Sequence, residues 1–133
     1  MATGPLVSIV DDDAAAADAV AGLVRSLGFA AETFDSAEAF LASGAVARSA
    51  CLIADVRMPA MTGPELFERL VAAGTPVPTI LMSAHDDFNM ARLNPHHDLC
   101  GFLAKPLNPD ALLDCIGSAF ARRPGGAGGP AAP

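Results

Sequence analysis

The 133-residue sequence predicts a doubly wound α/β fold, in which helices cover both faces of a single parallel sheet. Two observations support this prediction. Five short apolar runs, each as long as a buried strand, alternate with segments whose apolar residues recur at helical spacing. Four of these runs end in acidic, hydroxyl or basic side chains, and such groups at the carboxyl ends of parallel strands are typical of a ligand site.

The first strand and the first helix have the plainest patterns. Leu6–Val10 is rich in β-branched residues and stops at three aspartates, which predicts a buried strand. From Ala14 the pattern is helical, and its apolar positions are Val20, Leu23, Val24 and Leu27. Asp13 is the expected N-cap of this helix, and Gly28 stands where a C-cap glycine is expected.

A second strand and a short second helix follow. Ala30–Phe34 is the strand, and residues 35–38, which read Asp-Ser-Ala-Glu, have the form of a capping box. Phe40 and Leu41 then provide the apolar face of the helix. Residues 44–49 are expected to be a loop that leads into the third strand.

The third strand covers residues 51–54, an apolar stretch that ends at Asp55. An apolar run without alternation predicts a strand buried on both faces, as in a parallel sheet. Thr62 and Glu65 then form a capping box, and Gly74 ends the helix that the box begins. The apolar face of this helix consists of Leu66, Phe67, Leu70 and Val71.

Residues 77–83 and 100–104 are the fourth and fifth strands. Pro78 belongs at the start of the fourth strand, because it has no N–H to give to a central ladder. Asn108 is the expected N-cap of the last helix, with Pro109 at its first position. The apolar face of this helix is expected to hold Leu112, Leu113, Ile116 and Phe120.

The segment between the fourth and fifth strands fits the pattern less well. Residues 87–93 have room for about two helical turns, but Pro95 disfavours continuation, so residues 94–98 are predicted to be non-helical. The expected folded domain is residues 1–121. Residues 122–133, rich in Gly, Pro and Ala, are expected to be a flexible tail or a truncated linker.

The composition excludes several function classes. Fifteen acidic residues against eight basic ones give a net charge of −7, and no basic stripe is present for binding nucleic acid directly. No apolar run reaches the roughly 18 residues of a membrane span, and the N-terminus lacks the features of a signal peptide. A cytoplasmic location is therefore expected. Three cysteines without CxxC spacing are interpreted as small buried apolar residues: Cys51, Cys100 and Cys115.

Alternation of five strands with helices predicts a flavodoxin-like (βα)5 fold with strand order 2-1-3-4-5. The switch point of that order lies between the first and third strands, where ligands bind in such sheets. The carboxyl ends of parallel strands share one edge of the sheet. Residues that are distant in sequence should therefore meet there: Asp11, Asp12, Asp55, Ser83 and Lys105.

This combination of side chains favours a metal-assisted phosphoryl transfer. Carboxylates within about 4 Å of one another repel by roughly 4 kcal/mol per pair at an effective dielectric of 20, so either a proton or a cation must join them. Oxygen ligands with room for water suit Mg²⁺. Beside the metal, Asp55 is a candidate nucleophile toward a phosphoryl group. Lys105 would neutralise charge on that group and Ser83 would donate a hydrogen bond to it.

The sequence resembles the receiver domain of two-component response regulators from Leu6 to about Phe120. A further stretch, residues 36–41, resembles the nitrogen-fixation regulator branch of that family. The matching motifs are Ile9-Val10-Asp11-Asp12, Asp55-Val56-Arg57-Met58-Pro59, Thr62-Gly63-Pro64-Glu65-Leu66, Ser83-Ala84 and Lys105-Pro106.

The resemblance implies a Mg²⁺-dependent phosphoacceptor. Asp55 would take a phosphoryl group from the histidine of a sensor kinase or phosphotransfer protein. Asp12 would bind Mg²⁺ directly and Asp11 would assist, often through water. Asp55 and the backbone carbonyl of Arg57 would complete the protein ligands. The chain would then be a signalling switch that helps to catalyse its own phosphorylation and dephosphorylation, rather than an enzyme acting on other substrates.

The resemblance also implies how such a switch changes state. Ser83 would move onto the phosphoryl group, and the ring of Phe102 would change rotamer with it. Lys105 would pair with the phosphoryl group, and its bond to Pro106 is expected to be cis. The partners would be the kinase and a downstream protein, or a second copy in a homodimer. The chain would be either a stand-alone receiver or part of a longer regulator.

Two alternatives stay open at this point. A phosphohydrolase with an aspartyl-phosphate intermediate needs two aspartates two residues apart after the first strand, and Asp11 and Asp13 have that spacing. However, Ala15 stands where such enzymes carry Thr or Val, and no cap domain is visible. The second alternative is a degenerate receiver that serves only as a protein-interaction module. The acid pair, Ser83 and Lys105 argue against it.

Overall fold

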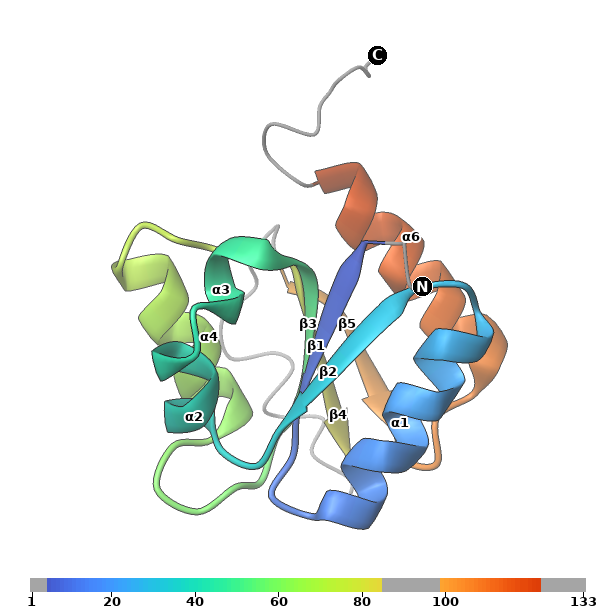
Figure 1. Cartoon of the computed structure of the whole chain (residues 1–133), viewed down its shortest axis with the longest axis horizontal. Coiled ribbons are helices and arrows are strands. Elements are labelled where there is room, and N and C mark those ends of the chain that lie inside the picture. Colours follow the sequence, from blue (N-terminus) through green and yellow to red (C-terminus); the bar gives the residue numbers. More distant parts are fainter. Residues whose placement is uncertain (1–4, 85–98, 123–133) are drawn as a thin grey trace.

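A computed structural model of the chain describes residues 5–84 and 99–122. Its centre is a five-stranded sheet in which every neighbouring pair of strands is parallel. The strand order is β2-β1-β3-β4-β5, which confirms the predicted flavodoxin-like order (Figure 1). The strands are β1 (Leu6–Val10), β2 (Ala30–Phe34), β3 (Ser49–Asp55), β4 (Thr79–Ser83) and β5 (Leu99–Ala104).

Helices cover both faces of the sheet, as Figure 1 shows. The described helices are α1 (Ala14–Ser26), α2 (Ala37–Ala42), α3 (Ala45–Arg48), α4 (Gly63–Ala72) and α6 (Pro109–Arg122). Helices α1 and α6 pack with one face of the sheet around Val24 and Ile116, whereas α2, α3 and α4 pack on the other face around Phe40 and Leu66. Burial of two apolar layers holds the strands, and with them the positions of their ends.

The helix ends follow the predicted caps. Asp13 accepts the backbone N–H groups of Ala15 and Ala16 at the start of α1. At α4 the reciprocal capping box is complete, since Thr62 accepts from the N–H of Glu65 and the Glu65 carboxylate accepts from the N–H of Thr62. Two further predicted caps are also present: Asn108 accepts from the N–H of Ala111 at the start of α6, and Gly28 has a φ of 100° after the end of α1.

Three local predictions were wrong. Residues 44–49 are not simply a loop, because Ala45–Arg48 forms the short helix α3 and β3 begins at Ser49. The box at residues 35–38 is incomplete: Ser36 caps α2 by accepting from Ala39, the third helical residue, so no acidic side chain returns the bond. Strand β4 begins at Thr79, two residues later than predicted, directly after a proline without an N–H.

The observed burial of side chains also differs from the predicted core at some positions. Leu113 is 42% exposed, because it lies on the outer side of α6, whereas Leu112 and Ile116 are fully buried. Small residues that carried no prediction fill the space next to the sheet: Ala17, Ala21 and Ala119. Among the cysteines, Cys51 is buried and Cys100 and Cys115 are only half-buried. Burial raises the pKa of the Cys51 thiol well above its ordinary value, which suits a packing role.

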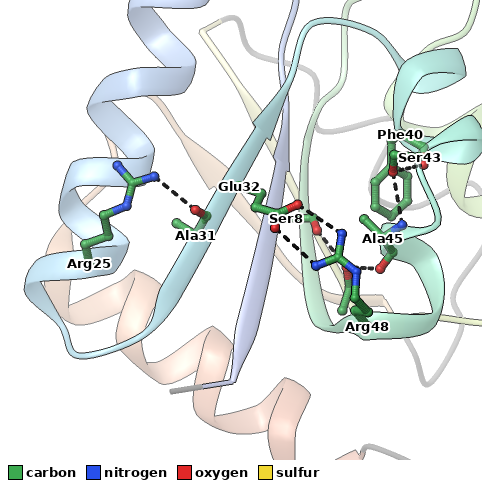
Figure 2. A network of polar contacts seen from close by, with 9 residues as sticks. Ser8, Arg25, Ala31, Glu32, Phe40, Ser43, Ala45 and Arg48 are labelled. Atoms are coloured by element: carbon green, nitrogen blue, oxygen red, sulfur yellow. Dashed lines mark hydrogen bonds and ion pairs between the residues drawn. The ribbon is translucent and has the colours of Figure 1, made fainter. Parts of the chain in front are cut away.

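The amino side of the sheet carries a polar network, drawn in Figure 2. The hydroxyls of Ser8 on β1 and Ser49 on β3 are 2.6 Å apart, and Ser49 Oγ donates to the carbonyl of Ala45 in α3 at 2.7 Å. On the surface above them, Arg48 forms a two-bonded ion pair with Glu32. This network attaches the unpredicted helix α3 to the central strands.

Two predictions fall outside the described residues: the non-helical stretch at residues 94–98 and the flexible tail, of which only residue 122 is described, as the last residue of α6. Across the part of the chain that the structure covers, the helices are too short and too polar to span a bilayer.

Candidate functional site

The predicted site residues meet at the carboxyl edge of the sheet. Asp55 and Ser83 are the last residues of β3 and β4, Asp11 follows β1, and Lys105 follows β5. Because β1 and β3 are neighbours, the first and third strand ends lie side by side at the switch point of the sheet. A cleft of about 300 Å³ is lined by Asp11, Asp12, Asp13, Asp55, Arg57, Ser83, Ala84 and Lys105.

Lys105 joins two of the carboxylates. Its Nζ lies 2.8 Å from Asp11 Oδ2 and 3.1 Å from Asp55 Oδ1. The side chains of Asp11 and Asp55 are only 1% and 9% exposed, so these bonds form largely away from water. Burial alone would lower the pKa of Lys105, but its bonds to the two carboxylates outweigh burial and raise that pKa above its ordinary value.

Asp55 is under opposing influences. Burial raises the pKa of its carboxyl group, Lys105 acts to lower it, and the charges of Asp11 and Asp12 raise it further. The net pKa of Asp55 lies above its ordinary value. The site therefore concentrates negative charge that Lys105 only partly compensates, which is the situation in which a bound cation is most favourable.

The donor set fits a hard divalent cation. Carboxylate oxygens of Asp11, Asp12 and Asp55 all lie within 4.8 Å of one another. Asp11 is held in place twice, since its Oδ1 accepts the N–H of Asp13 at 3.0 Å and its Oδ2 accepts from Lys105. Asp12 is exposed and faces the open side of the cleft. Oxygen-only donors with an open side suit Mg²⁺, which keeps several waters.

Asp13 does not join this cluster. Its carboxylate is used in capping α1, and the three clustered acids do not include it. A phosphohydrolase that used Asp11 as nucleophile and Asp13 as acid/base would need both side chains at the reacting atoms. Here Asp11 is bonded to Lys105 and Asp13 to the helix, so the geometry argues against that alternative.

The remaining predicted residues are placed around the cleft. Ser83 is buried at its wall, next to the exposed Ala84. Phe102 lies on β5, is partly buried and packs with the core under α4. The peptide bond between Lys105 and Pro106 is cis, as expected.

One contact at the site was not predicted from the sequence. Gly63, the first residue of α4, lies so close to Asp55 that a Cβ there would be 2.5 Å from the Asp55 backbone oxygen. The sequence around it was interpreted as a capping box and as one of the motifs of the family resemblance, and neither interpretation gave Gly63 a contact with Asp55. Gly63 stands at the first helical position, where no turn geometry requires a glycine. That placement is the sequence signal that could have indicated the close contact with Asp55.

Comparison with known proteins identifies the family. The family described as "Response regulator receiver domain" matches residues 7–117. The chain is 38% identical over 119 residues to the response regulator protein TmoT of Ectopseudomonas mendocina, covering 90% of this chain and 54% of TmoT. It is 37% identical over 120 residues to the transcriptional regulatory protein FixJ of Bradyrhizobium diazoefficiens, covering 90% of this chain and 58% of FixJ.

Similarity to solved structures supports the same family. The chain resembles the crystal structure of FixJ-N with a TM-score of 0.78 and 30% identity, covering 90% of this chain and 96% of that one. It resembles the response regulator StyR with a TM-score of 0.76 and 35% identity, covering 91% and 61%. The similarity to FixJ confirms the predicted resemblance to the nitrogen-fixation regulator branch. The chain spans a little over half the length of these curated relatives. We conclude that it belongs to the response regulator receiver domain family of two-component signalling.

Proposed function

We propose that this receiver domain is phosphorylated on Asp55 by a histidine kinase or phosphotransfer protein and thereby changes its interactions with a downstream partner. The observation that carries the proposal is the bridge from Lys105 Nζ to both Asp11 and Asp55 at the floor of an acidic cleft. It places a fixed positive charge beside Asp55, the buried carboxylate that ends β3. Such charge stabilises the oxygens of a transferring phosphoryl group.

The chain's own residues supply most of the proposed chemistry. An oxygen of Asp55 attacks the phosphorus of the donor, and the bond from phosphorus to the leaving nitrogen or oxygen breaks, with its electron pair leaving on that atom. The product is an acyl phosphate on Asp55, which water later hydrolyses. Lys105 would hold the phosphoryl group as an ion pair, and Ser83 at the cleft wall would donate a hydrogen bond to it.

The carboxylates of Asp11, Asp12 and Asp55 would hold Mg²⁺, with the backbone carbonyl of Arg57 as the further protein ligand. When bound, the metal would neutralise charge on the transferred group. The role of Phe102 as the aromatic that reports the phosphorylated state is part of the same proposal. Phe102 is partly buried and packs against the core that includes the buried face of α4.

The test uses Mg²⁺ with acetyl phosphate, followed by mass spectrometry of the intact protein. We expect one phosphoryl group per chain, absent from Asp55→Asn and absent when Mg²⁺ is removed by a chelator. Asp13→Asn is the matched control, because asparagine also caps a helix and Asp13 lies at the same cleft outside the acid cluster. It should be phosphorylated like the wild type.

Two outcomes would contradict the proposal. No adduct on the wild-type protein, with the domain folded and Mg²⁺ present, would favour a degenerate interaction module. Turnover of small phosphate esters that is lost in both Asp11→Asn and Asp13→Asn would favour the phosphohydrolase.

A further inference from the structure

Gly63 and Asp55 meet through their backbones. A Cβ atom at Gly63 would lie 2.5 Å from the backbone oxygen of Asp55 and 3.1 Å from its carbonyl carbon. The third atom it would meet is Cδ2 of Leu81, also at 3.1 Å. These distances are shorter than packed heavy atoms allow, so the start of α4 can occupy its place only because residue 63 has no side chain.

The glycine is required for space and not for backbone conformation. Gly28, Gly44 and Gly74 have φ values of 100°, 82° and 78°, which other residues rarely adopt. Gly63 is not among the residues with positive φ and begins a regular helix. The helix would accept alanine there on propensity alone, since alanine is the best helix former.

Neither partner of this contact can move freely. Helix α4 is fixed by its complete capping box and by Leu66 and Leu70, which are buried in the core. On the other side, the peptide that follows Asp55 donates its Val56 N–H to the carbonyl of Met82 at 2.8 Å. The Leu81 side chain can rotate away from a new methyl group, but the Asp55 carbonyl can turn away only with its whole peptide plane, which would disturb the bond from the Val56 N–H to Met82.

We propose that Gly63 is a positioning residue for phosphoryl transfer: its missing side chain lets α4 abut the backbone of Asp55 and so fixes where the carboxylate points. A displaced Asp55 backbone changes the distance from its carboxylate to Lys105 and the direction of attack on a donor. This inference rests on the proposed function. Misplacement of a reacting group by about 1 Å costs up to roughly 100-fold in rate.

The test compares Gly63→Ala with Gly22→Ala. Gly22 lies on the exposed side of α1, and a Cβ there meets nothing within 4 Å. With acetyl phosphate and Mg²⁺ at saturating concentrations, we expect the phosphorylation rate of Gly63→Ala to fall by roughly 10- to 100-fold and that of Gly22→Ala to stay within about twofold of wild type. Ile116→Val, in the core on the opposite face of the sheet, controls for a general loss of stability.

A second substitution separates displacement of Asp55 from simple crowding. Gly63→Ala combined with Leu81→Ala removes the side-chain contact and leaves the contact with the Asp55 backbone. We expect no recovery of rate in the double variant. Recovery to the wild-type rate would overturn the proposal, because the methyl group would then act through Leu81. A Gly63→Ala rate within about twofold of wild type would overturn it as well.

Backbone amide NMR shifts give a readout that needs no phosphorylation. Relative to wild type, Gly63→Ala should change the amides of Asp55 and Val56 most among residues of the sheet. Such changes in a protein that acetyl phosphate does not modify would reject the proposed function and still support the positioning of Asp55. Unchanged amides at Asp55 and Val56 would overturn the positioning itself. If Gly63→Ala unfolds, an osmolyte that favours compact states restores the conditions for both measurements.

Discussion

The two sides of the central strands carry polar groups of different kinds. On the amino side, Ser8 and Ser49 form a short chain of neutral hydrogen bonds that ends at the carbonyl of Ala45 (Figure 2). On the carboxyl side, Asp11 and Asp55 share the ammonium of Lys105, with Asp12 nearby. Both sides satisfy their hydrogen bonds: across residues 5–84 and 99–122, no buried side-chain N or O atom lacks a partner.

The difference between the sides lies in charge. The chain of hydroxyls formed by Ser8 and Ser49 is uncharged and fully hydrogen-bonded. It therefore contributes to stability alone. The acidic cluster is hydrogen-bonded but not neutralised, and burial raises the pKa of Asp55. A site whose hydrogen bonds are complete but whose negative charge is not fully compensated favours the binding of a cation. The comparison therefore predicts that substitutions on the amino side change stability alone, whereas substitutions on the carboxyl side also change phosphorylation.

The largest effect is expected from Lys105→Met, which removes the shared cation and leaves the buried carboxyl group of Asp11 without its ion-pair partner. Breaking a buried ion pair at one partner costs about 3 kcal/mol. Urea unfolding of the metal-free protein at pH 7 should show that loss. Phosphorylation by acetyl phosphate should also fall, by roughly 100-fold or more, if Lys105 stabilises the transferred group. Wild-type stability and rate in this variant would contradict the role given to the carboxyl side.

Ser49→Ala is the corresponding substitution on the amino side. It leaves the hydroxyl of Ser8, which is fully buried, without its partner and removes the donor to Ala45. An unpaired buried polar group costs about 1–3 kcal/mol, so the urea midpoint should fall clearly. The rate of phosphorylation should stay at the wild-type value, because the network lies on the amino side of the central strands and Asp55 lies at their carboxyl ends.

The double variant Ser8→Ala/Ser49→Ala is the control for Ser49→Ala. Removing both hydroxyls leaves one fewer unpaired group, so the combined loss should be smaller than the sum of the single losses. Simple additivity would show that the two hydroxyls do not depend on each other.

A smaller effect with the opposite sign is expected for Asp55→Asn. The pKa of Asp55 is raised above its ordinary value of 3.8, chiefly by burial, so the charged form is disfavoured in the folded protein. The contribution of Asp55 to stability is thus fully present below pH 3.8 and is lost as pH rises through its folded pKa. Asparagine avoids this loss and should therefore raise the free energy of unfolding of the metal-free protein at pH 7.

The pH dependence is the check on Asp55→Asn. Urea unfolding of both proteins should show the advantage of Asn shrinking as pH falls toward 3.8, because all other titrating groups are common to the two. Saturating Mg²⁺ should reverse the order at pH 7, since the wild-type carboxylate would contribute a ligand to the proposed metal site. An advantage that is independent of pH would place its cause elsewhere than in the charge of Asp55.

These two sides were not equally predictable from the sequence. Strand order and the convergence of Asp11, Asp55 and Lys105 follow from apolar runs and from the rule that parallel strands end at one edge. Helix α3 was missed because four residues, Ala45–Arg48, are too few to show helical periodicity. It forms because tertiary contacts hold it: Ala45 is buried and its carbonyl accepts from Ser49.

The limits at the site have a similar cause. The sequence indicates which side chains gather, but not that Lys105 bonds two acids at once, because that depends on how far each strand extends. The contact of Gly63 with the Asp55 backbone is equally hidden, since it depends on where α4 begins relative to β3. Periodicity describes one element at a time, and these contacts exist only between elements.

The smallest effect is expected from Arg48→Gln, although Figure 2 shows Arg48 in the most conspicuous contact of the amino side. Its two bonds to Glu32 lie at the surface, with the side chains 53% and 44% exposed. Water and salt screen such pairs, and holding two long side chains in one geometry costs entropy. We expect no detectable shift of the urea midpoint at physiological ionic strength. Glu32→Gln should behave in the same way. A loss as large as that of Ser49→Ala would show that the ion pair attaches α3 to the sheet as strongly as the buried hydroxyl chain does.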